Sequence, residues 1–245
     1  MKQLILLAPL ALAGCATLFG PKSPFAVDRK GELVEFNYAW SAEASAVPAL
    51  VRRLNSDLET SFSAASATAK ADRAAAEAAK RRFNGHQFNR RWTTAGQSWR
   101  LLSLGAETLN FTGGAYPSHG SDALLWERVT RREIKVERMF SADDDLENLV
   151  HAPFCVTLEG ERAKRQGAAA QAGDASSVCP KISELAVLPA DSNANRRFDR
   201  FRLIAPPGAV GTSEGRYDIA IPVTAELRAA LKPAYRSSFE VVQPQ

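Results

Sequence analysis

The segment QFNRRWTTAGQSWRLLSLGAETLNFTGG, residues 87–114, alternates apolar and polar side chains over most of its length. Phe88 and Trp92 alternate with polar neighbours, and the alternation resumes after the small residues Ala95 and Gly96. A period of two is typical of strands, and connections this short cannot hold a crossover helix. With the residues that follow, the segment predicts an antiparallel meander of strands over residues 87–94, 98–104, 107–112, 122–129 and 134–137.

Upstream of the meander, the sequence predicts one strand and then helix. Apolar residues alternate with polar ones from Leu33 to Trp40, which indicates a half-buried strand. An apolar stripe with a spacing of four residues follows, formed by Leu50, Leu54, Leu58 and Phe62. Residues 64–79 are rich in Ala, the strongest helix former. We expect two helices, or one long kinked helix, over residues 46–83.

Downstream, the sequence predicts a second set of helices and strands. Ser141 precedes an acid-rich turn that suits a helix N-terminus, and Pro153 favours the start of another helix. Strands are expected at 184–189, 198–204 and 216–221, before a short helix at 224–231. The order predicts an α+β fold, with antiparallel sheets and helices packed on one side. We expect two halves of similar size, an N-terminal subdomain 31–105 and a C-terminal subdomain 106–240.

The N-terminus has the pattern of a secretion signal. Lys2 precedes an apolar run that is too short to span a bilayer and fits a signal peptide. The run Leu12-Ala13-Gly14-Cys15 resembles a bacterial lipobox, which implies a lipoprotein signal peptide over 1–14 and lipidation of Cys15. A plain signal peptide cleaved nearby is the alternative. Ala16 at the next position favours the outer membrane, facing the periplasm, and residues 15–30 are expected to form a tether.

The other two cysteines form an even pair. In an oxidising compartment Cys155 and Cys179 are expected to form a disulfide, which stabilises by roughly 3–4 kcal/mol. Two buried free thiols are the alternative. Neither cysteine lies in a CxxC motif or has a histidine at ligand spacing on the same predicted element, so neither zinc binding nor catalysis is expected.

Composition and motifs argue against an enzyme. The share of hydrophobic residues is 45% and that of charged residues 24%, which excludes a disordered tail and a multi-span membrane protein. Motifs of nucleophilic hydrolases, metalloproteases and nucleotide-binding loops are missing from the sequence. Ser118, His119 and Asp122 lie too close along the chain to build a catalytic triad. We expect no catalytic residue, metal or cofactor.

Two basic clusters occur at residues 70–100 and 196–202, in a chain whose net charge is only +4. They could contact phosphates or carboxylates of the envelope or an acidic partner, or they are simply solvated faces near a negatively charged membrane. Nucleic acid is disfavoured as a partner, because the predicted compartment contains none.

One motif resembles a known family. Residues 109–116, LNFTGGAY, precede the strand-like Leu124-Leu125-Trp126 and then Ile134–Phe140. This order resembles the extracytoplasmic domains of RsiV-type anti-sigma factors, and Tyr217–Pro222 before a short helix is also similar. The resemblance covers residues 32–235 and implies an α+β fold and, in the anti-sigma members, binding of lysozyme. Tyr116 stands where that family usually has His, and Arg138 where it often has Asp.

The sequence therefore favours a non-enzymatic lipoprotein that binds a cell-wall-related ligand, possibly lysozyme or peptidoglycan fragments. The expected contact is the turn at Tyr116, Pro117, Ser118 and His119, because side chains on a short rigid turn suit recognition. An envelope scaffold or assembly lipoprotein with a protein partner is the alternative. A hydrolase ranks last, since it would need a buried cluster of carboxylates or histidines.

Overall fold

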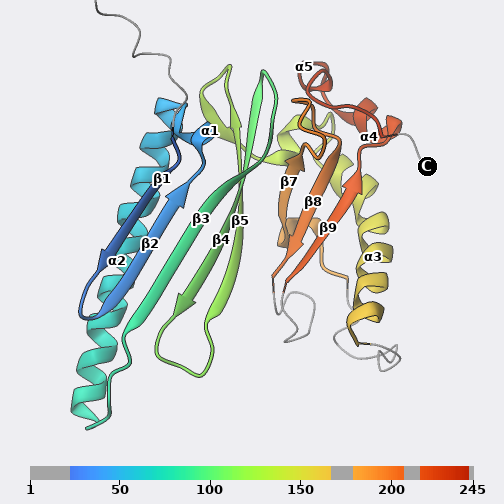
Figure 1. Ribbon diagram of the computed structural model, residues 1–245. Helices are drawn as coiled ribbons and strands as arrows, with labels where there is room; N and C mark the ends of the chain where they lie inside the picture. Colours follow the sequence, from blue (N-terminus) through green and yellow to red (C-terminus); the bar gives the residue numbers. More distant parts are fainter. Residues whose placement is uncertain (1–22, 167–178, 207–215, 243–245) are drawn as a thin grey trace, which may run out of the picture.

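Two β-sheets organise the protein in a computed structural model that describes residues 23–166, 179–206 and 216–242 (Figure 1). The larger sheet has the strand order β1-β2-β3-β4-β5-β6 and the smaller one the order β7-β8-β9. Their bounds are β1 Phe25–Lys30, β2 Val34–Trp40, β3 His86–Gln97, β4 Leu101–Phe111, β5 Ser118–Glu127, β6 Arg132–Ile134, β7 Ala186–Ala190, β8 Arg200–Ala205 and β9 Tyr217–Pro222. The predicted α+β class is confirmed.

The two long helices lie on the outer faces of the two sheets, and the short helices lie at the top of the view (Figure 1). The helices are α1 Ala42–Ser45, α2 Pro48–Ala78, α3 Asp145–Gln166, α4 Ala225–Ala230 and α5 Pro233–Arg236, with 3-10 turns η1 Val136–Met139 and η4 Ile182–Glu184. The long helix α2 covers the six-stranded sheet, and α3 packs against the three-stranded one. No helix in the described ranges is both long enough and apolar enough to cross a membrane.

Strand pairing in the larger sheet defines two ends. β3 to β6 form the predicted antiparallel meander, whereas β2 and β3 pair in parallel because α2 crosses between them. We call the end that holds Trp40, Gln97 and Glu127 the upper end, as in Figure 1. The connection between β4 and β5 lies at the opposite, lower end. The two sheets pack together near the upper end and diverge toward the lower end (Figure 1).

Helix α2 follows its predicted stripe, with Pro48 in the first turn where no backbone donor is needed. Leu50, Leu54 and Leu58 are buried against the sheet, where they meet aromatic side chains of β2 and β3. Beyond Phe62 the buried positions are Ala residues. Because Ala fills little space, the lower half of α2 leaves open volume between helix and sheet.

The prediction of a tether over 15–30 is wrong for its last six residues. Phe25–Lys30 form the edge strand β1, and Phe25 stacks on Trp40 with ring centroids 3.8 Å apart. The alternation of Phe25, Val27 and Arg29 was a strand signal, but it is short and follows Pro24 directly. The signal peptide, Cys15 and the rest of the tether lie outside the described residues.

The expected boundary between halves at residues 105 and 106 falls inside the continuous strand β4. Gly105 does not break the strand. Instead, Leu188 of β7 lies over it, so that a Cβ at Gly105 would be 2.8 Å from the Leu188 Cδ1 atom. The glycine is therefore a point of close contact between the two sheets, which is one of the roles of a strand glycine.

Helix α3 corrects a second prediction, because Pro153 lies inside one helix and does not start a new one. Val150, Phe154 and Leu158 are fully buried on either side of the proline. Their burial outweighs the backbone hydrogen bond that proline removes, since that loss costs about 3 kcal/mol.

Candidate functional site

The predicted recognition turn connects β4 to β5 at the lower end of the sheet (Figure 1). Gly113 has a φ of 82°, which favours glycine, and its carbonyl accepts a hydrogen bond from Asn84 Nδ2 at 3.2 Å. Only Gly113 of the glycine pair has positive φ within the described chain. Tyr116 at the tip is 87% exposed. An aromatic side chain held out on an anchored turn is suited to contact a partner.

A groove of about 460 Å³ lies next to this turn. We call it the edge groove, and its lining residues are Phe88, Arg90, Thr108, Asn110, Ser118, His119, Gly120, Ser121, Asp122 and Pro206. Two of the predicted contact residues, Ser118 and His119, therefore line it. Tyr116 and Pro117 are exposed in the turn beside them. The volume lies within the usual range for small-molecule sites.

Arg90 is the central charge of the edge groove. Its Nε donates to Thr108 Oγ1 at 2.9 Å, and its NH1 donates to the Asp57 carboxylate at 3.0 Å. Its NH2 lies 3.4 Å from Asp122. The guanidinium is thus fixed by two carboxylates on different elements. Because the two carboxylates outnumber the guanidinium, this fixed arrangement favours polar or zwitterionic ligands over simple anions.

A buried chain of hydrogen bonds holds Asp57, the ion-pair partner of Arg90, in place. Trp92 Nε1 donates to Tyr38 Oη at 2.8 Å, and the Tyr38 hydroxyl donates to Asp57. Burial raises the pKa of Tyr38 strongly, and the hydrogen bond to Asp57 raises it further. Tyr38 therefore stays a neutral donor at physiological pH, which fixes the Asp57 carboxylate and, through it, Arg90.

Two more grooves flank the lower half of α2. One of about 280 Å³ shares the lining residues Phe88 and Asn110 with the edge groove, so the two are adjacent. The other, about 660 Å³, lies between α2 and the β1–β2 hairpin. Part of its polar lining is already paired, since Arg29 binds Glu59 and lies 4.5 Å from the Phe62 ring centroid. The edge groove is the better candidate because hydroxyl, amide and imidazole groups line it together.

The side chains rejected as a catalytic triad do not form one. Ser118 and His119 are consecutive in β5, so their side chains point to opposite faces of the sheet. The Ser118 hydroxyl donates to the Asn110 carbonyl at 3.1 Å.

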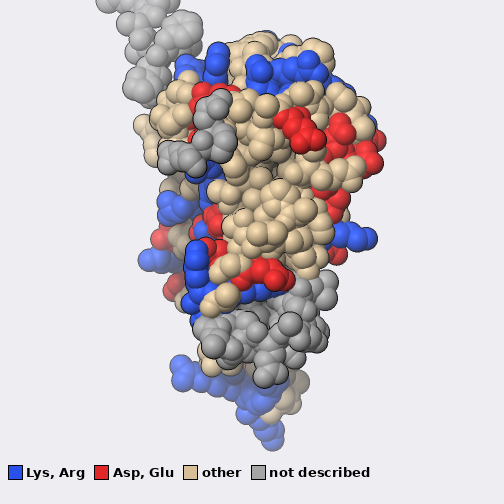
Figure 2. Space-filling model, turned by 90° about the vertical axis from the view of Figure 1, so that its right-hand side faces the viewer, with Lys and Arg blue, Asp and Glu red and all other residues tan. Residues whose placement is uncertain are grey.

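Only part of the two basic clusters is ion-paired among the described residues. Arg73 binds Glu32 and Glu77, and Arg202 binds Asp218. Arg196 and Arg197 form no ion pair with any described residue, and Lys and Arg side chains gather along the upper end of the molecule in Figure 2. Each cluster thus combines ion-paired arginines with residues that form no ion pair among the described residues. These are Lys70, Lys80, Arg81, Arg82 and Arg91 in the first cluster and Arg196 and Arg197 in the second.

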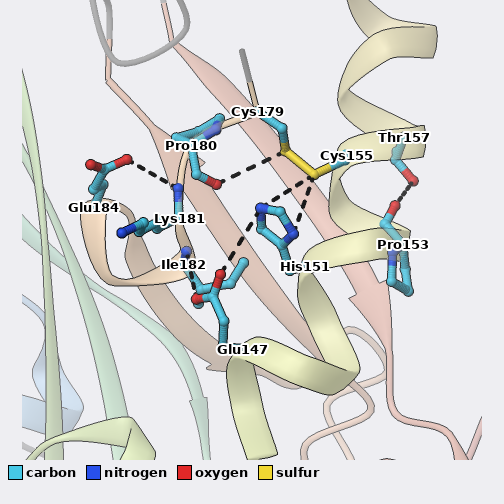
Figure 3. The surroundings of a disulfide bond; sticks show 10 residues. All are labelled: Glu147, His151, Pro153, Cys155, Thr157, Cys179, Pro180, Lys181, Ile182 and Glu184. Carbon is cyan, nitrogen blue, oxygen red and sulfur yellow. Dashed lines mark hydrogen bonds and ion pairs between the residues drawn. A yellow bond between two sulfur atoms is a disulfide. The ribbon is translucent and has the colours of Figure 1, made fainter. Parts of the chain in front are cut away.

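The disulfide joins Cys155 of α3 to Cys179, with a Cα–Cα distance of 5.6 Å (Figure 3). The expectation that no histidine lies near it was wrong. His151 is one turn before Cys155 in the same helix, with its Nε2 atom 3.5 Å from the Cys155 sulfur. Placing a helix start at Pro153 had separated the two residues. While the disulfide is intact the sulfurs are not thiolates, so this trio is not a metal site.

The site residues that sequence reasoning missed are Phe88, Arg90, Asn110 and Asp57. Three of them come from strand residues that pair across β3 and β4, and Asp57 from α2. Only the register of the strands brings them together. The alternation in residues 87–94 predicted a strand, but it did not predict the register in which that strand pairs with β4.

Comparisons with known proteins identify the fold. No protein-family model matches the chain, and no curated protein matches it in sequence. A solved DUF3298 family protein from Pseudomonas aeruginosa is similar, at 13% identity and a TM-score of 0.53, over 87% of this chain and 96% of that one. A DUF3298 family member from Bacteroides fragilis has 13% identity and a TM-score of 0.50, over 88% of this chain and 95% of the other. At this identity the likeness shows the fold alone.

Proposed function

We propose that this chain is a non-enzymatic binding protein of the bacterial cell envelope that recognises a cell-wall-related ligand at the β4–β5 turn and the edge groove. The observation that carries the proposal is the exposed Tyr116 beside a groove with a fixed Arg90 at its centre. The resemblance of residues 109–116 to the RsiV-type domains supports the same region. The protein is anchored through a lipid on Cys15, in the outer membrane and facing the periplasm.

The chemistry of the groove favours peptidoglycan fragments as the ligand. Hydroxyl and amide groups of Thr108, Asn110 and Ser118 suit the hydroxyls and amides of a glycan or short peptide. Aromatic rings such as Phe88 and Tyr116 pack on the apolar face of a sugar. Asp122 and Arg90 offer opposite charges to a peptide that has both an amine and a carboxylate. Lysozyme, which the resemblance implies, is the second ligand to test.

The test measures binding of the processed full chain, kept in mild detergent, to soluble peptidoglycan fragments and to immobilised lysozymes at two salt concentrations. We expect a Kd tighter than ~1 μM for one of them, about −8 kcal/mol. The affinity should survive the higher salt, because nonspecific ionic binding is screened. Tyr116→Ala should weaken binding at least about tenfold, as removal of a central aromatic contact does.

Trp99→Ala is the matched control, because Trp99 is also an exposed aromatic residue but lies on the β3–β4 turn at the upper end. It should bind like the unaltered chain. Equal losses in the two variants would contradict the assignment of the site, and no binding to either ligand would overturn the proposed ligand class.

One feature favours the alternative, an assembly lipoprotein with a protein partner. β6 pairs only with Leu125–Glu127, so the outer edge of β5 from Ser118 to Leu124 has no partner strand among the described residues. Such an edge can take up an extended segment of another protein. Envelope cross-linking from residue 121 that captures one protein, with no binding of wall fragments, would select this function.

A further inference from the structure

The start of the described chain and two strand connections lie at the same end of the molecule. Phe25 pairs with Trp40, and Trp40 pairs in parallel with Trp92. β1 therefore begins at the upper end, beside the β3–β4 and β5–β6 connections (Figure 1). Cys15 precedes Ser23 by eight residues, which span at most about 28 Å when fully extended. A lipid on Cys15 would keep the upper end near the membrane.

The upper end has a set of arginines without acidic partners. We call it the basic surface, and its residues are Arg128, Arg131, Arg132, Arg196 and Arg197. None of the five forms an ion pair with a carboxylate in the part of the chain that the structure describes. The neighbouring acids are engaged elsewhere: Glu133 binds Arg53, and Glu127 binds Arg100. The five arginine side chains therefore form no ion pair with an acidic side chain among the described residues.

Arg128 and Arg196 bring two positive charges together from different connections. Burial lowers the pKa of Arg128, and the charge of Arg196 lowers it further. The NH2 group of Arg128 donates to the neutral amide of Gln97 at 3.0 Å, while its buried Nε has no hydrogen-bond partner among the described residues. Asp191 accepts hydrogen bonds from the backbone N–H groups of Asn195 and Arg196, which fixes the loop. The positive charges of Arg128 and Arg196 therefore repel each other, and an anion bound between them would relieve this repulsion.

Exposed apolar side chains accompany these charges. Trp99 in the β3–β4 connection is 59% exposed, and Val129 in the β5–β6 connection is 56% exposed. The two connections are adjacent, since Arg128 N donates to the Arg100 carbonyl at 2.7 Å. Tryptophan is the side chain most suited to the boundary between water and lipid, because its ring is apolar and its indole N–H is polar.

We propose that the basic surface docks on the anionic headgroups of the membrane, with the arginines on lipid phosphates and Trp99 at the interface. Three independent observations support it: unpaired arginines, an exposed tryptophan among them, and the start of the described chain at the same end. The docked domain would stand upright, with the β4–β5 turn and Tyr116 at the far end of the sheet, directed away from the membrane. The inference adds an orientation to the proposed binding function, and its failure would leave the edge groove intact.

The experiment uses the fluorescence of Trp99. The other tryptophans, Trp40, Trp92 and Trp126, are buried, so a quencher in the lipid reports on Trp99. The processed full chain is added to vesicles of phosphatidylglycerol or of phosphatidylcholine, both with brominated acyl chains. We expect strong quenching on phosphatidylglycerol, weak quenching on phosphatidylcholine, and reversal by high salt.

A pair of matched variants tests the location. Arg196→Gln with Arg197→Gln removes two charges from the basic surface and should weaken docking about 30-fold, because each charge near an anionic surface contributes about fivefold. Arg81→Gln with Arg82→Gln removes two exposed charges just after α2, at the lower end, and should leave the quenching unchanged. Similar losses in the two variants, or unchanged quenching in the first, would overturn the proposal.

Sedimentation of the same vesicles at high salt separates docking from anchoring. Retention of the chain at high salt reports the lipid on Cys15, and Trp99 quenching at low salt reports the basic surface. Quenching on phosphatidylglycerol supports docking whether or not the chain is retained. Absence of quenching overturns docking even when retention shows that the anchor is in place.

Discussion

The upper and lower ends of the six-stranded sheet are built in different ways. At the upper end, β3 and the β3–β4 connection contact the second half of the chain. The Oγ atoms of Ser98 and Ser238 are 2.9 Å apart, and Asp191 N donates to the Ala95 carbonyl at 3.1 Å. At the lower end α2 faces the sheet with Ala side chains and grooves open beside it. The same sheet thus has one end closed by packing and one end left accessible, and the candidate ligand site is at the accessible end.

The largest expected effect sharpens this contrast along α2 itself. Leu54→Ala should lower the free energy of unfolding by about 3 kcal/mol, because Leu54 is fully buried against the sheet and its loss leaves a cavity. Ala69→Gly, in the lower half of the helix, should cost only about 1 kcal/mol, chiefly through helix propensity. Denaturant unfolding of both variants measures the difference. Equal costs would show that the two halves of α2 are held with equal strength.

A glycine pair tests the contact between the sheets. A Cβ at Gly96 would lie 2.7 Å from the Asp191 backbone nitrogen and 2.9 Å from the Phe198 ring, so Gly96→Ala should destabilise by about 2 kcal/mol. Gly114 has no atom within 4 Å of such a Cβ, and Gly114→Ala should stay within about 0.5 kcal/mol. Thermal unfolding distinguishes them. If Gly96→Ala left the stability unchanged, the backbone at the upper end would accommodate a Cβ as readily as the β4–β5 turn does.

The smallest effect is a pH dependence of the upper end. Burial alone would raise the pKa of Glu127, but hydrogen bonds from Thr130 and Arg100 and the charge of Arg100 outweigh it and lower that pKa below its ordinary value of 4.5. Glu127 therefore stabilises the fold fully above the unfolded pKa, and this contribution declines as the pH falls through 4.5 toward the lower folded pKa. The contribution should amount to about 1 kcal/mol.

Thermal unfolding at several pH values measures this effect. Glu127→Gln should flatten the acid side of the stability profile, whereas Glu59→Gln should change it little, because the Glu59–Arg29 pair is exposed on α2. If both substitutions changed the pH dependence of stability equally, the loss of stability at acid pH would not come from the Arg100–Glu127 contact.

The sequence predicted those parts of the fold whose signals are local. The stripe of Leu50, Leu54 and Leu58 predicted α2, and the alternation after Gln87 predicted the meander. The failures came from residues with two possible roles. The boundary between the two subdomains was expected after residue 105, but Gly105 lies inside β4 and contacts Leu188. Pro153 was expected to start a helix, but it lies inside α3.

The candidate site was only half predictable for a related reason. Tyr116 and His119 are next to a turn signal in the sequence, so their placement at a loop could be inferred. Arg90 and Asp57 are separated by 33 residues and meet only because α2 crosses from β2 to β3. Long-range pairing of this kind depends on topology, which periodicity does not specify.

The composition of the core under α2 has a consequence for assembly. All of its buried residues, from Phe36 to Trp126, belong to the first part of the chain. This half can collapse while later residues are still being delivered, because it needs no contact from them. The strands β7 to β9 then pack against the folded six-stranded sheet and bury Leu101 and Leu125, which belong to the second core cluster. A chain that emerges from its N-terminus would thus complete the core of the six-stranded sheet before the remainder arrives.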